Sequence, residues 1–221
     1  MIKLEFNGSK IEIKSTKIVA AARNYKAHAE EMKVSIPKKP EIFLKPPSAL
    51  ITNNDVVILP KVSKRIDYEV ELAVIIKNRC HNISIKEVVE NILGYTVLVD
   101  VTARDIQEEA RKSGMPWSIS KGFDTFAPIG PKIIAAGKID VDNLDIWLKV
   151  NGEYKQQSNT RYMIFSTEKL ISFTSKIMTL EPMDIIASGT PEGVGPMNDG
   201  DFIEAGIEGI GVLKFSAKKE I

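Results

Sequence analysis

The segment that most constrains the fold is RIDYEVELAVII at residues 65–76, whose acidic half runs directly into an apolar half. Asp67, Glu69 and Glu71 stand at every second position, so a β-strand places their carboxylates on one face. Like charges beside one another on a strand repel. Because the apolar half predicts a buried strand, we expect a positive group over the acidic face, and a bound cation would supply it.

Composition restricts what that cation can be. The chain contains one cysteine and two histidines, which excludes an internal disulfide, a cysteine zinc cluster and a site of several imidazoles. Any metal is therefore held by oxygen, and Asp100 in the buried run at 94–102 offers a third carboxylate. Three carboxylates suit Mg²⁺ or Mn²⁺ and leave coordination positions open for water or substrate. The alternative is that Glu69 and Glu71 line the wet face of an edge strand.

The totals predict an ordinary globular protein without a highly charged partner. The 221 residues are 43% hydrophobic and 27% charged, which is enough for one core and one domain. The net charge of +1, from 30 basic and 29 acidic residues, provides no field for nucleic acid or an anionic membrane. No apolar run approaches the ~20 residues of a membrane span, and the first ten residues lack a secretory apolar core, so we expect a cytoplasmic protein.

Turn signals and strand patterns dominate the chain. Asn-Gly pairs at 7–8 and 151–152 stand between alternating apolar and charged residues and predict two β-hairpins. There is no regular alternation of strands and helices, so we predict an α+β fold that is mainly β, with a few peripheral helices. We interpret residues 1–17 as a small N-terminal hairpin extension and residues 18–221 as the main domain of a chain that forms a single domain overall.

Helices are predicted where capping signals flank a helical pattern. The capping-box spacing of Ser84 and Glu87 predicts a helix over 84–93. A second helix over 103–114 should close at its last residue, a glycine. A third helix, over 166–178, should face the core at Leu170, Phe173 and Ile177.

A possible acid–base pair lies in the polar, alanine-rich stretch 22–32, which predicts a short helix. His28 and Glu31 are three residues apart there, so the carboxylate can hold the imidazole and raise its basicity. This is how a water-activating pair is built. The alternative is a surface histidine beside a surface glutamate.

Other motifs are excluded as reactive sites. The glycine-rich segment 188–196 has no following Lys-Ser or Lys-Thr and opens no helix, so nucleotide binding is not predicted. The segment 206–211 lacks the context of a dinucleotide fingerprint and predicts a turn between strands. Cys80 has no convincing base beyond its neighbour His81, and we interpret both as structural.

Seven segments, in order from about residue 18 to residue 215, resemble the fumarylacetoacetate hydrolase superfamily. The chain is most similar to the short acylpyruvate hydrolase and oxaloacetate decarboxylase type, which lacks the large N-terminal domain of the eukaryotic fumarylacetoacetases. The segments are ARNYKAHAEEM, PEIFLKPPSALI, DYEVELAVII, GYTVLVDVTARDIQ, KGFDTFAPIGP, LKVNGEYKQQSNTRYMIFS and MTLEPMDIIASGTPEGVGPMNDGD.

The resemblance implies a rolled, mixed β-sandwich, usually a homodimer, with one Mg²⁺ or Mn²⁺ per chain. A Glu-x-Glu pair and a later Asp hold the metal in that family, and they match Glu69, Glu71 and Asp100. A His and a Glu three residues on, after an Arg-Asn-Tyr block, form its water-activating pair and match His28 and Glu31.

Further matches imply residues around the metal. Lys121 matches a lysine near the metal and is expected to take part in catalysis. Arg161-Tyr162 and Pro47 depart from the pattern of many relatives, so the chemical identity of the far end of the substrate is not predicted. The expected substrate contacts are Arg23, Lys45, Arg104, Gln107 and Thr190.

The implied activity is metal-dependent hydrolysis of a carbon–carbon bond in acylpyruvates, which are 2,4-dioxo acids such as fumarylpyruvate, to pyruvate and a carboxylic acid. Decarboxylation of oxaloacetate can share such a site. The alternatives are an isomerase of 2-hydroxyhepta-2,4-diene-1,7-dioate, a dehydratase of a 2-oxo sugar acid and a cation-stabilised scaffold without chemistry. The His28 and Glu31 pair argues against the scaffold, which would have no use for a base beside an open metal site.

Overall fold

The fold is built mainly from β-strands. A computed structural model describes residues 2–221. No helix in this part of the chain has the length and apolar character to span a bilayer. The helices are α1 (Lys26–Glu31), α2 (Arg104–Ser113), α3 (Ser118–Lys121) and α4 (Thr167–Ile177). The strands are β1 (Ile2–Phe6), β2 (Ser9–Ile13), β3 (Ile18–Ala22), β4 (Glu41–Lys45), β5 (Leu50–Ile51), β6 (Val56–Leu59), β7 (Ile66–Tyr68), β8 (Val70–Ile76), β9 (Ile92–Val99), β10 (Thr102–Ala103), β11 (Ala127–Ala135), β12 (Asp145–Val150), β13 (Glu153–Asn159), β14 (Ile185–Ala187), β15 (Gly195–Pro196), β16 (Phe202–Ile207) and β17 (Gly211–Lys219).

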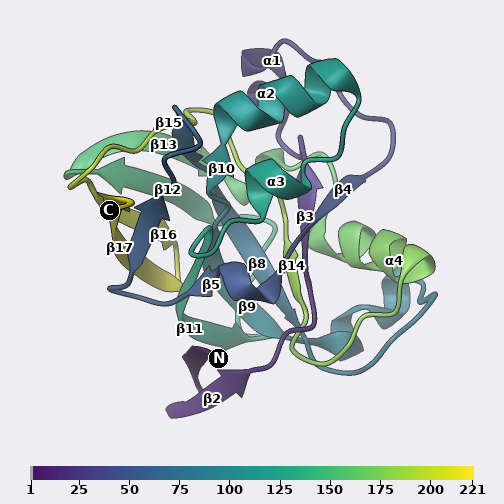
Figure 1. Ribbon diagram of the computed structural model, residues 1–221. Helices are drawn as coiled ribbons and strands as arrows, with labels where there is room; N and C mark the ends of the chain where they lie inside the picture. Colours follow the sequence, from purple (N-terminus) through teal and green to yellow (C-terminus); the bar gives the residue numbers. More distant parts are fainter. Residues whose placement is uncertain (1) are drawn as a thin grey trace.

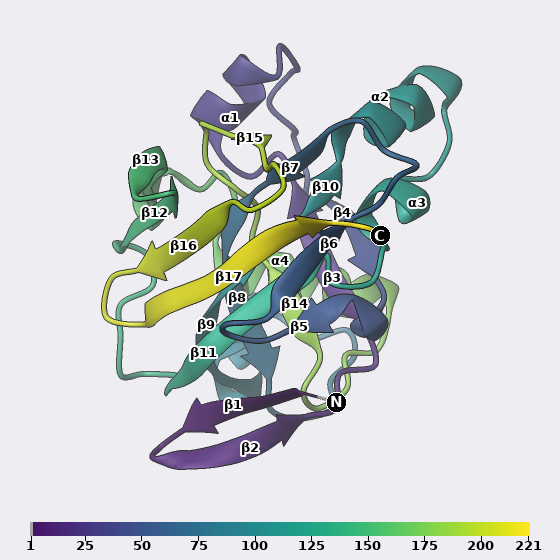
Figure 2. The same cartoon turned by 60° about the vertical axis from the view of Figure 1, so that its left-hand side comes forward.

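Two large sheets pack against each other around the core. The nine-stranded sheet has the order β2-β1-β11-β9-β8-β14-β3-β4 with β5 beside β11, and the five-stranded sheet has the order β13-β12-β16-β17-β6. Strands β8, β9 and β11 contact β12, β16 and β17 of the other sheet. Helices α1, α2 and α3 gather at one end of the molecule, opposite the β1–β2 hairpin (Figures 1 and 2). This arrangement confirms the predicted α+β fold that is mainly β.

Both Asn-Gly pairs form the predicted hairpin turns. Asn7 and Gly8 have φ angles of 50° and 79°, and Asn151 and Gly152 have φ angles of 52° and 82°. Positive φ at both central positions is what a tight hairpin turn requires. The first hairpin adds to the edge of the large sheet, because β1 runs parallel to β11.

The predicted helix over 84–93 is wrong beyond its first turn. Ser84 and Glu87 form the capping box, but only short 3₁₀ turns follow, at Ile85–Glu87 and Val89–Asn91. The chain then enters β9, which pairs with β8 on one side and β11 on the other. Tertiary pairing of a buried, β-branched segment thus overrides the local capping signal. The helix over 103–114 forms as predicted, and Gly114 caps α2 in the left-handed conformation, with φ 67°.

Helix α4 forms as predicted, and of its three expected core residues Leu170 is buried, Phe173 is half-buried and Ile177 is exposed. Leu170 and Ile171 are buried, whereas Ile177 is 54% exposed. Small hydroxyl residues continue the buried stripe: Ser172 Oγ donates to the Ile83 carbonyl at 2.8 Å, and Ser175 Oγ accepts from the Ile83 amide at 3.1 Å. Their small side chains allow the segment before the capping box to pack against the helix, a contact that the apolar spacing alone does not predict.

Two substitutions on α4 test which stripe carries its packing. Leu170→Ala is expected to lower the free energy of unfolding by about 2–5 kcal/mol, because it leaves a cavity in the core. The matched change Ile177→Ala should alter it by less than about 0.5 kcal/mol, since that side chain is exposed. Urea unfolding followed by circular dichroism measures both values. Equal losses would contradict the orientation of the helix.

Candidate active site

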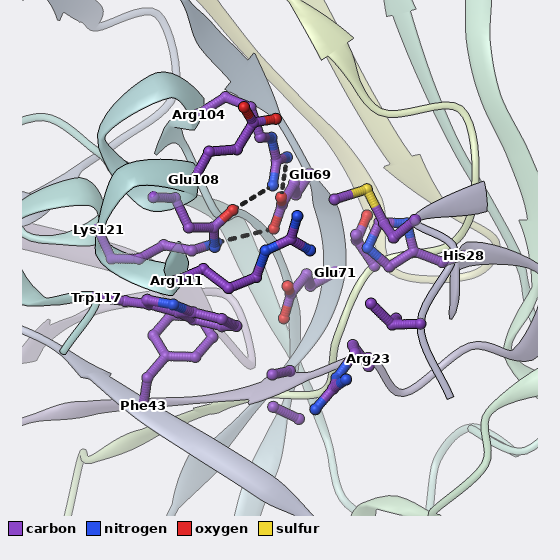
Figure 3. Close-up of a pocket in the computed structure, with 16 residues that line it drawn as sticks. Arg23, His28, Phe43, Glu69, Glu71, Arg104, Glu108, Arg111, Trp117 and Lys121 are labelled. Atoms are coloured by element: carbon purple, nitrogen blue, oxygen red, sulfur yellow. Dashed lines mark hydrogen bonds and ion pairs between the residues drawn. The ribbon is translucent and has the colours of Figure 1, made fainter. Parts of the chain in front are cut away.

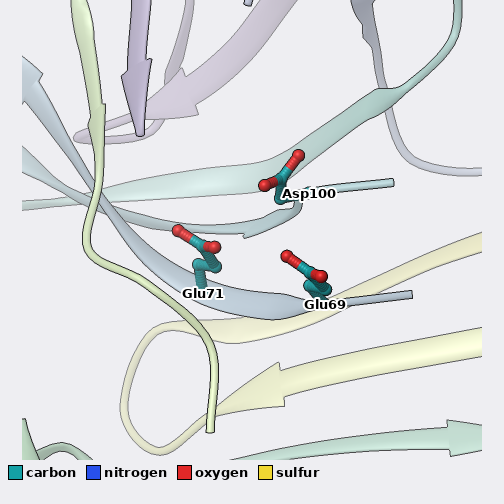
Figure 4. A group of neighbouring side chains, drawn as sticks. All are labelled: Glu69, Glu71 and Asp100. Atoms are coloured by element: carbon teal, nitrogen blue, oxygen red, sulfur yellow. The ribbon is translucent and has the colours of Figure 1, made fainter. Parts of the chain in front are cut away.

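Three carboxylates meet where β8 and β9 lie side by side (Figure 4). Glu71 belongs to β8, Glu69 immediately precedes it, and Asp100 immediately follows β9. The antiparallel register sets Val70 opposite Val99, and the Asp100 amide donates to the Glu69 carbonyl at 2.7 Å. One oxygen of each carboxylate lies within 4.8 Å of the others, and all three residues are buried. The fold therefore brings together Glu69, Glu71 and Asp100, which we call the carboxylate cluster.

Asp67 does not join the carboxylate cluster, so the prediction of one continuous acidic strand face is wrong at this residue. The chain breaks between β7 and β8 at Glu69, and β7 pairs with β10 and β15 instead of continuing in the large sheet. The Asp67 carboxylate accepts hydrogen bonds from Arg65 at 2.8 and 3.1 Å and from Arg104 at 2.8 Å. Two arginines thus supply the positive charge over this residue.

Two buried lysines hold Asp100 at opposite oxygens. Lys121 Nζ donates to Asp100 Oδ2 at 2.5 Å and to Glu69 Oε2 at 3.0 Å. Lys45 Nζ donates to Asp100 Oδ1 at 2.7 Å and to the carbonyl oxygens of Val101 and Lys121 at 3.1 and 2.6 Å. All three donors of Lys45 are therefore engaged by the protein. For this residue we propose a role in positioning Asp100 in place of the expected contact with substrate.

Arg104 and Gln107 approach the carboxylate cluster from the first turn of α2. Arg104 pairs with Glu69 and Asp67, and its remaining NH1 group donates to Gln107 Oε1 at 2.6 Å. Burial opposes the charge of the guanidinium, but the two carboxylates outweigh burial and raise the pKa of Arg104. Arg104 is therefore a fixed cation in the site.

Glu71 is the member of the carboxylate cluster that no lysine or arginine pairs with in residues 2–221. Its Oε2 accepts a hydrogen bond from the Gly189 amide at 2.7 Å. Burial, followed by the charges of Asp100 and Glu69, raises the pKa of Glu71 well above its ordinary value. Burial also opposes the charge of Glu69, but neighbouring cations outweigh it and lower the pKa of that carboxyl. An oxygen-only ligand set with one uncompensated carboxylate fits a hard divalent cation.

His28 and Glu31 form a contact across one turn of α1. His28 Nδ1 lies 3.2 Å from Glu31 Oε2, and the same carboxylate accepts from the Gly193 amide at 3.1 Å. Glu31 therefore links the short helix to the glycine-rich loop that follows β14. The imidazole is largely buried, which supports a held base over a free surface histidine.

A cavity of about 220 Å³ opens over the carboxylate cluster (Figure 3). Glu31, Lys45 and Asp100 do not line it, but each forms a hydrogen bond with a residue that does. The structure thus divides the expected site residues into a lining group and a supporting group. The lining group is Arg23, His28, Glu69, Glu71, Arg104, Gln107, Lys121 and Thr190.

Parallel strands bring Arg23 and Thr190 to the same end of the large sheet. Strand β3 runs parallel to β14, so the residues that follow each strand emerge side by side. Arg23 has a φ of 56° and pairs with Glu41 of β4. The departures from the family pattern, Arg161, Tyr162 and Pro47, all lie outside the cavity lining.

Sequence reasoning missed part of the cavity wall. Phe43, Glu108, Arg111 and Trp117 also line it. The spacing of α2 could have identified Arg111, because positions three and seven residues after Arg104 lie on one helix face. The two aromatic residues come from β4 and from the turn before α3, and only the tertiary fold brings them together.

Gln156 is a second missed residue, and it positions the carboxylate cluster from β13. It is fully buried. Its Oε1 accepts a hydrogen bond from the Val70 amide at 3.0 Å, and its Nε2 donates to Thr190 Oγ1 at 2.9 Å and to the Pro191 carbonyl at 3.0 Å. Val70 separates the two glutamates of the carboxylate cluster, so one amide side chain ties them to the loop that carries Thr190.

Comparisons with known proteins point to one family. A family model described as fumarylacetoacetate (FAA) hydrolase C-terminal matches residues 17–216. An uncharacterised protein of Pyrococcus abyssi is 57% identical over 97% of this chain and 95% of its own length. The mitochondrial oxaloacetate tautomerase FAHD1 of Arabidopsis thaliana is 44% identical over 93% of this chain and 92% of its own length.

Among solved structures, fumarylpyruvate hydrolase from Pseudomonas aeruginosa in complex with Mn²⁺ and pyruvate superimposes with a TM-score of 0.93. It is 32% identical and covers 99% of this chain and 96% of its own. Fold and site together define a mainly β protein with a buried carboxylate cluster facing a cavity lined by cations. The chain belongs to the fumarylacetoacetate hydrolase family.

Gln156→Ala is expected to loosen the carboxylate cluster. It leaves the buried Val70 amide without a partner, and one such group costs about 1–3 kcal/mol of stability. We expect lower stability in urea unfolding and weaker Mn²⁺ binding in calorimetry. Gln157→Ala, on the exposed side of the same strand, is the matched control and should change neither. Wild-type Mn²⁺ affinity in Gln156→Ala would contradict the positioning role.

Proposed function

We propose that this chain is a divalent-metal-dependent hydrolase that cleaves a carbon–carbon bond of acylpyruvates and releases pyruvate and a carboxylic acid. One observation carries the proposal, namely that His28 and the glutamates of the carboxylate cluster face the same cavity. A 2,4-dioxo acid needs one end bound and a water activated at the other. The complex of the Pseudomonas aeruginosa hydrolase with Mn²⁺ and pyruvate supports the proposal, because it contains a divalent cation together with the product proposed here.

Glu69, Glu71 and Asp100 would hold the cation, Mg²⁺ or Mn²⁺, at one site per chain. When bound, the cation supplies Lewis-acid chemistry that polarises the 2-oxo group and offsets developing negative charge. Lys45 and Lys121 fix the two oxygens of Asp100, which orients the cluster before any ligand arrives. Because the carboxylates are already held in place, a cation can bind to them without a large entropic cost for ordering their side chains.

His28 is the general base in this proposal. Because Nδ1 faces the Glu31 carboxylate, Nδ1 carries the proton of the neutral imidazole and Nε2 is left to accept one. His28 takes a proton from water, and the water oxygen adds to the C4 carbonyl carbon. The C3–C4 bond breaks, its electron pair moves to C3 as the enolate of pyruvate, and the proton on His28 returns to C3. Lys121 and Arg104 are paired with carboxylates of the protein, but both line the cavity and would contribute positive potential beside the substrate carboxylate.

Keto–enol tautomerisation of oxaloacetate is a second candidate. The Arabidopsis thaliana tautomerase favours it, because its identity of 44% exceeds the 32% of the fumarylpyruvate hydrolase. The reaction needs only a proton moved between C3 and the 2-oxo oxygen, and His28 can move it without an attacking water. Decarboxylation of oxaloacetate would break the C3–C4 bond with loss of CO₂ and leave the enolate of pyruvate, which is the enolate that acylpyruvate cleavage also gives. The homodimer and the cytoplasmic location stay predictions.

Glu71→Gln is expected to abolish metal binding without unfolding the protein. The amide keeps the size of the side chain and, unlike Asp100→Ala, leaves both lysines with their carboxylate. EDTA-treated wild-type protein should bind Mn²⁺ at one site in calorimetry, and the variant should bind none. Metal at about 100 times its dissociation constant should stabilise the wild type by about 2.7 kcal/mol in urea unfolding and leave the variant unchanged.

The control for this test is Glu108→Gln, which removes an exposed carboxylate of the same cavity. It should keep the wild-type affinity for Mn²⁺. Equal Mn²⁺ affinity in Glu71→Gln and the wild type would contradict the assignment of the carboxylate cluster as the metal site.

His28→Ala is expected to lower acetylpyruvate hydrolysis by about 10²–10⁴-fold, because a general base contributes that much, while Mn²⁺ affinity stays unchanged. His81→Ala removes the other, exposed histidine and should have no effect. Loss of substrate absorbance and formation of pyruvate measure the rate. Normal hydrolysis by His28→Ala would contradict its role. Wild-type protein that tautomerises oxaloacetate but leaves acetylpyruvate intact would favour the second candidate.

A further inference from the structure

Arg111 is the cation of the cavity wall that has no protein partner. It lines the cavity from α2, and Figure 3 shows its guanidinium pointing into the space. Among residues 2–221 its side chain makes no ion pair and no hydrogen bond. Glu108, three residues earlier on the same helix, also lines the cavity but does not pair with it.

The other cations of the cavity wall already have carboxylate partners within the chain. Arg104 pairs with Asp67 and Glu69, and Lys121 pairs with the same Glu69 and with Asp100. Arg23 is paired with Glu41. A guanidinium has five N–H donors in a planar fork that matches a carboxylate at two points. Arg111 therefore keeps its full charge and its fork available for an anion that enters the cavity.

The place of Arg111 on α2 sets which end of a substrate it reaches. Arg104 contacts the carboxylate cluster, and Arg111 follows it by seven residues on the same helix face. At 1.5 Å per residue the two backbone positions are about 10 Å apart. A substrate whose 2-oxo acid end lies at the cluster would present its opposite end to Arg111.

We propose that Arg111 binds a second carboxylate at the far end of the substrate and makes this chain selective for dicarboxylic 2-oxo acids. The inference rests on the proposed function, because it takes the 2-oxo acid end to lie at the carboxylate cluster. The far carboxylate keeps its charge while the C3–C4 bond breaks. Arg111 therefore stabilises ground state and transition state alike, and its loss raises KM and leaves kcat nearly unchanged.

The test compares two substrates cleaved at the same bond, fumarylpyruvate with a far carboxylate and acetylpyruvate without one. Arg111→Gln should lower kcat/KM for fumarylpyruvate by about 10- to 100-fold through KM, as expected for the loss of a charged hydrogen bond. Its kcat/KM for acetylpyruvate and its inhibition by pyruvate should stay at wild-type values. Arg111→Lys keeps the charge without the fork and should recover part of the loss.

The matched control is Lys112→Gln, which removes the same charge from the next residue of α2, outside the cavity lining. It should behave as the wild type with both substrates. Equal effects of Lys112→Gln and Arg111→Gln, or an unchanged substrate ratio in Arg111→Gln, would overturn the inference and leave the proposed function intact. Cleavage of neither substrate by the wild-type protein with Mn²⁺ would overturn both.

Discussion

Three carboxylates removed from water and held within 4.8 Å of one another are the constraint around which this end of the molecule is organised. Each buried charge costs several kcal/mol unless a partner or a bound ion compensates it. Two lysines and an arginine compensate Asp100 and Glu69, while Glu71 receives only a backbone amide. Glu71 is therefore the carboxylate of the cluster without a cationic side-chain partner among residues 2–221, and it faces the cavity, where a bound cation would be its partner.

The fold places the carboxylate cluster on strands of the large sheet and other residues of the cavity on helices. The carboxylate cluster stands at adjacent ends of two strands in the middle of the large sheet, where ladder hydrogen bonds and Gln156 fix the backbone. His28 and Arg111 come from helices α1 and α2 at the edge of the cavity. Under the proposed function, the fixed cluster would bind the cation and the 2-oxo acid end of the substrate, and the helices would supply the base and the contact with the far end.

Local sequence patterns predicted the features that depend on local chemistry. The turn at Asn7-Gly8 and the glycine cap of α2 formed as expected because the local backbone conformation decides them. The buried strand before Asp100 was predictable from its continuous run of apolar and β-branched residues. The cluster was predictable because buried carboxylates at alternate positions require compensation. Asp67, by contrast, is compensated by Arg104 from a distant part of the sequence, so its strand could break away. The helix expected over 84–93 and the role of Gln156 likewise depend on pairing between distant segments.

The central claim is that Glu69, Glu71 and Asp100 hold one divalent cation. Diffraction from crystals grown with Mn²⁺, recorded on both sides of the manganese absorption edge, tests it most directly. The account predicts one strong anomalous peak per chain, at coordination distance from an oxygen of each of the three carboxylates. A peak elsewhere in the chain, or none between these carboxylates, would contradict it.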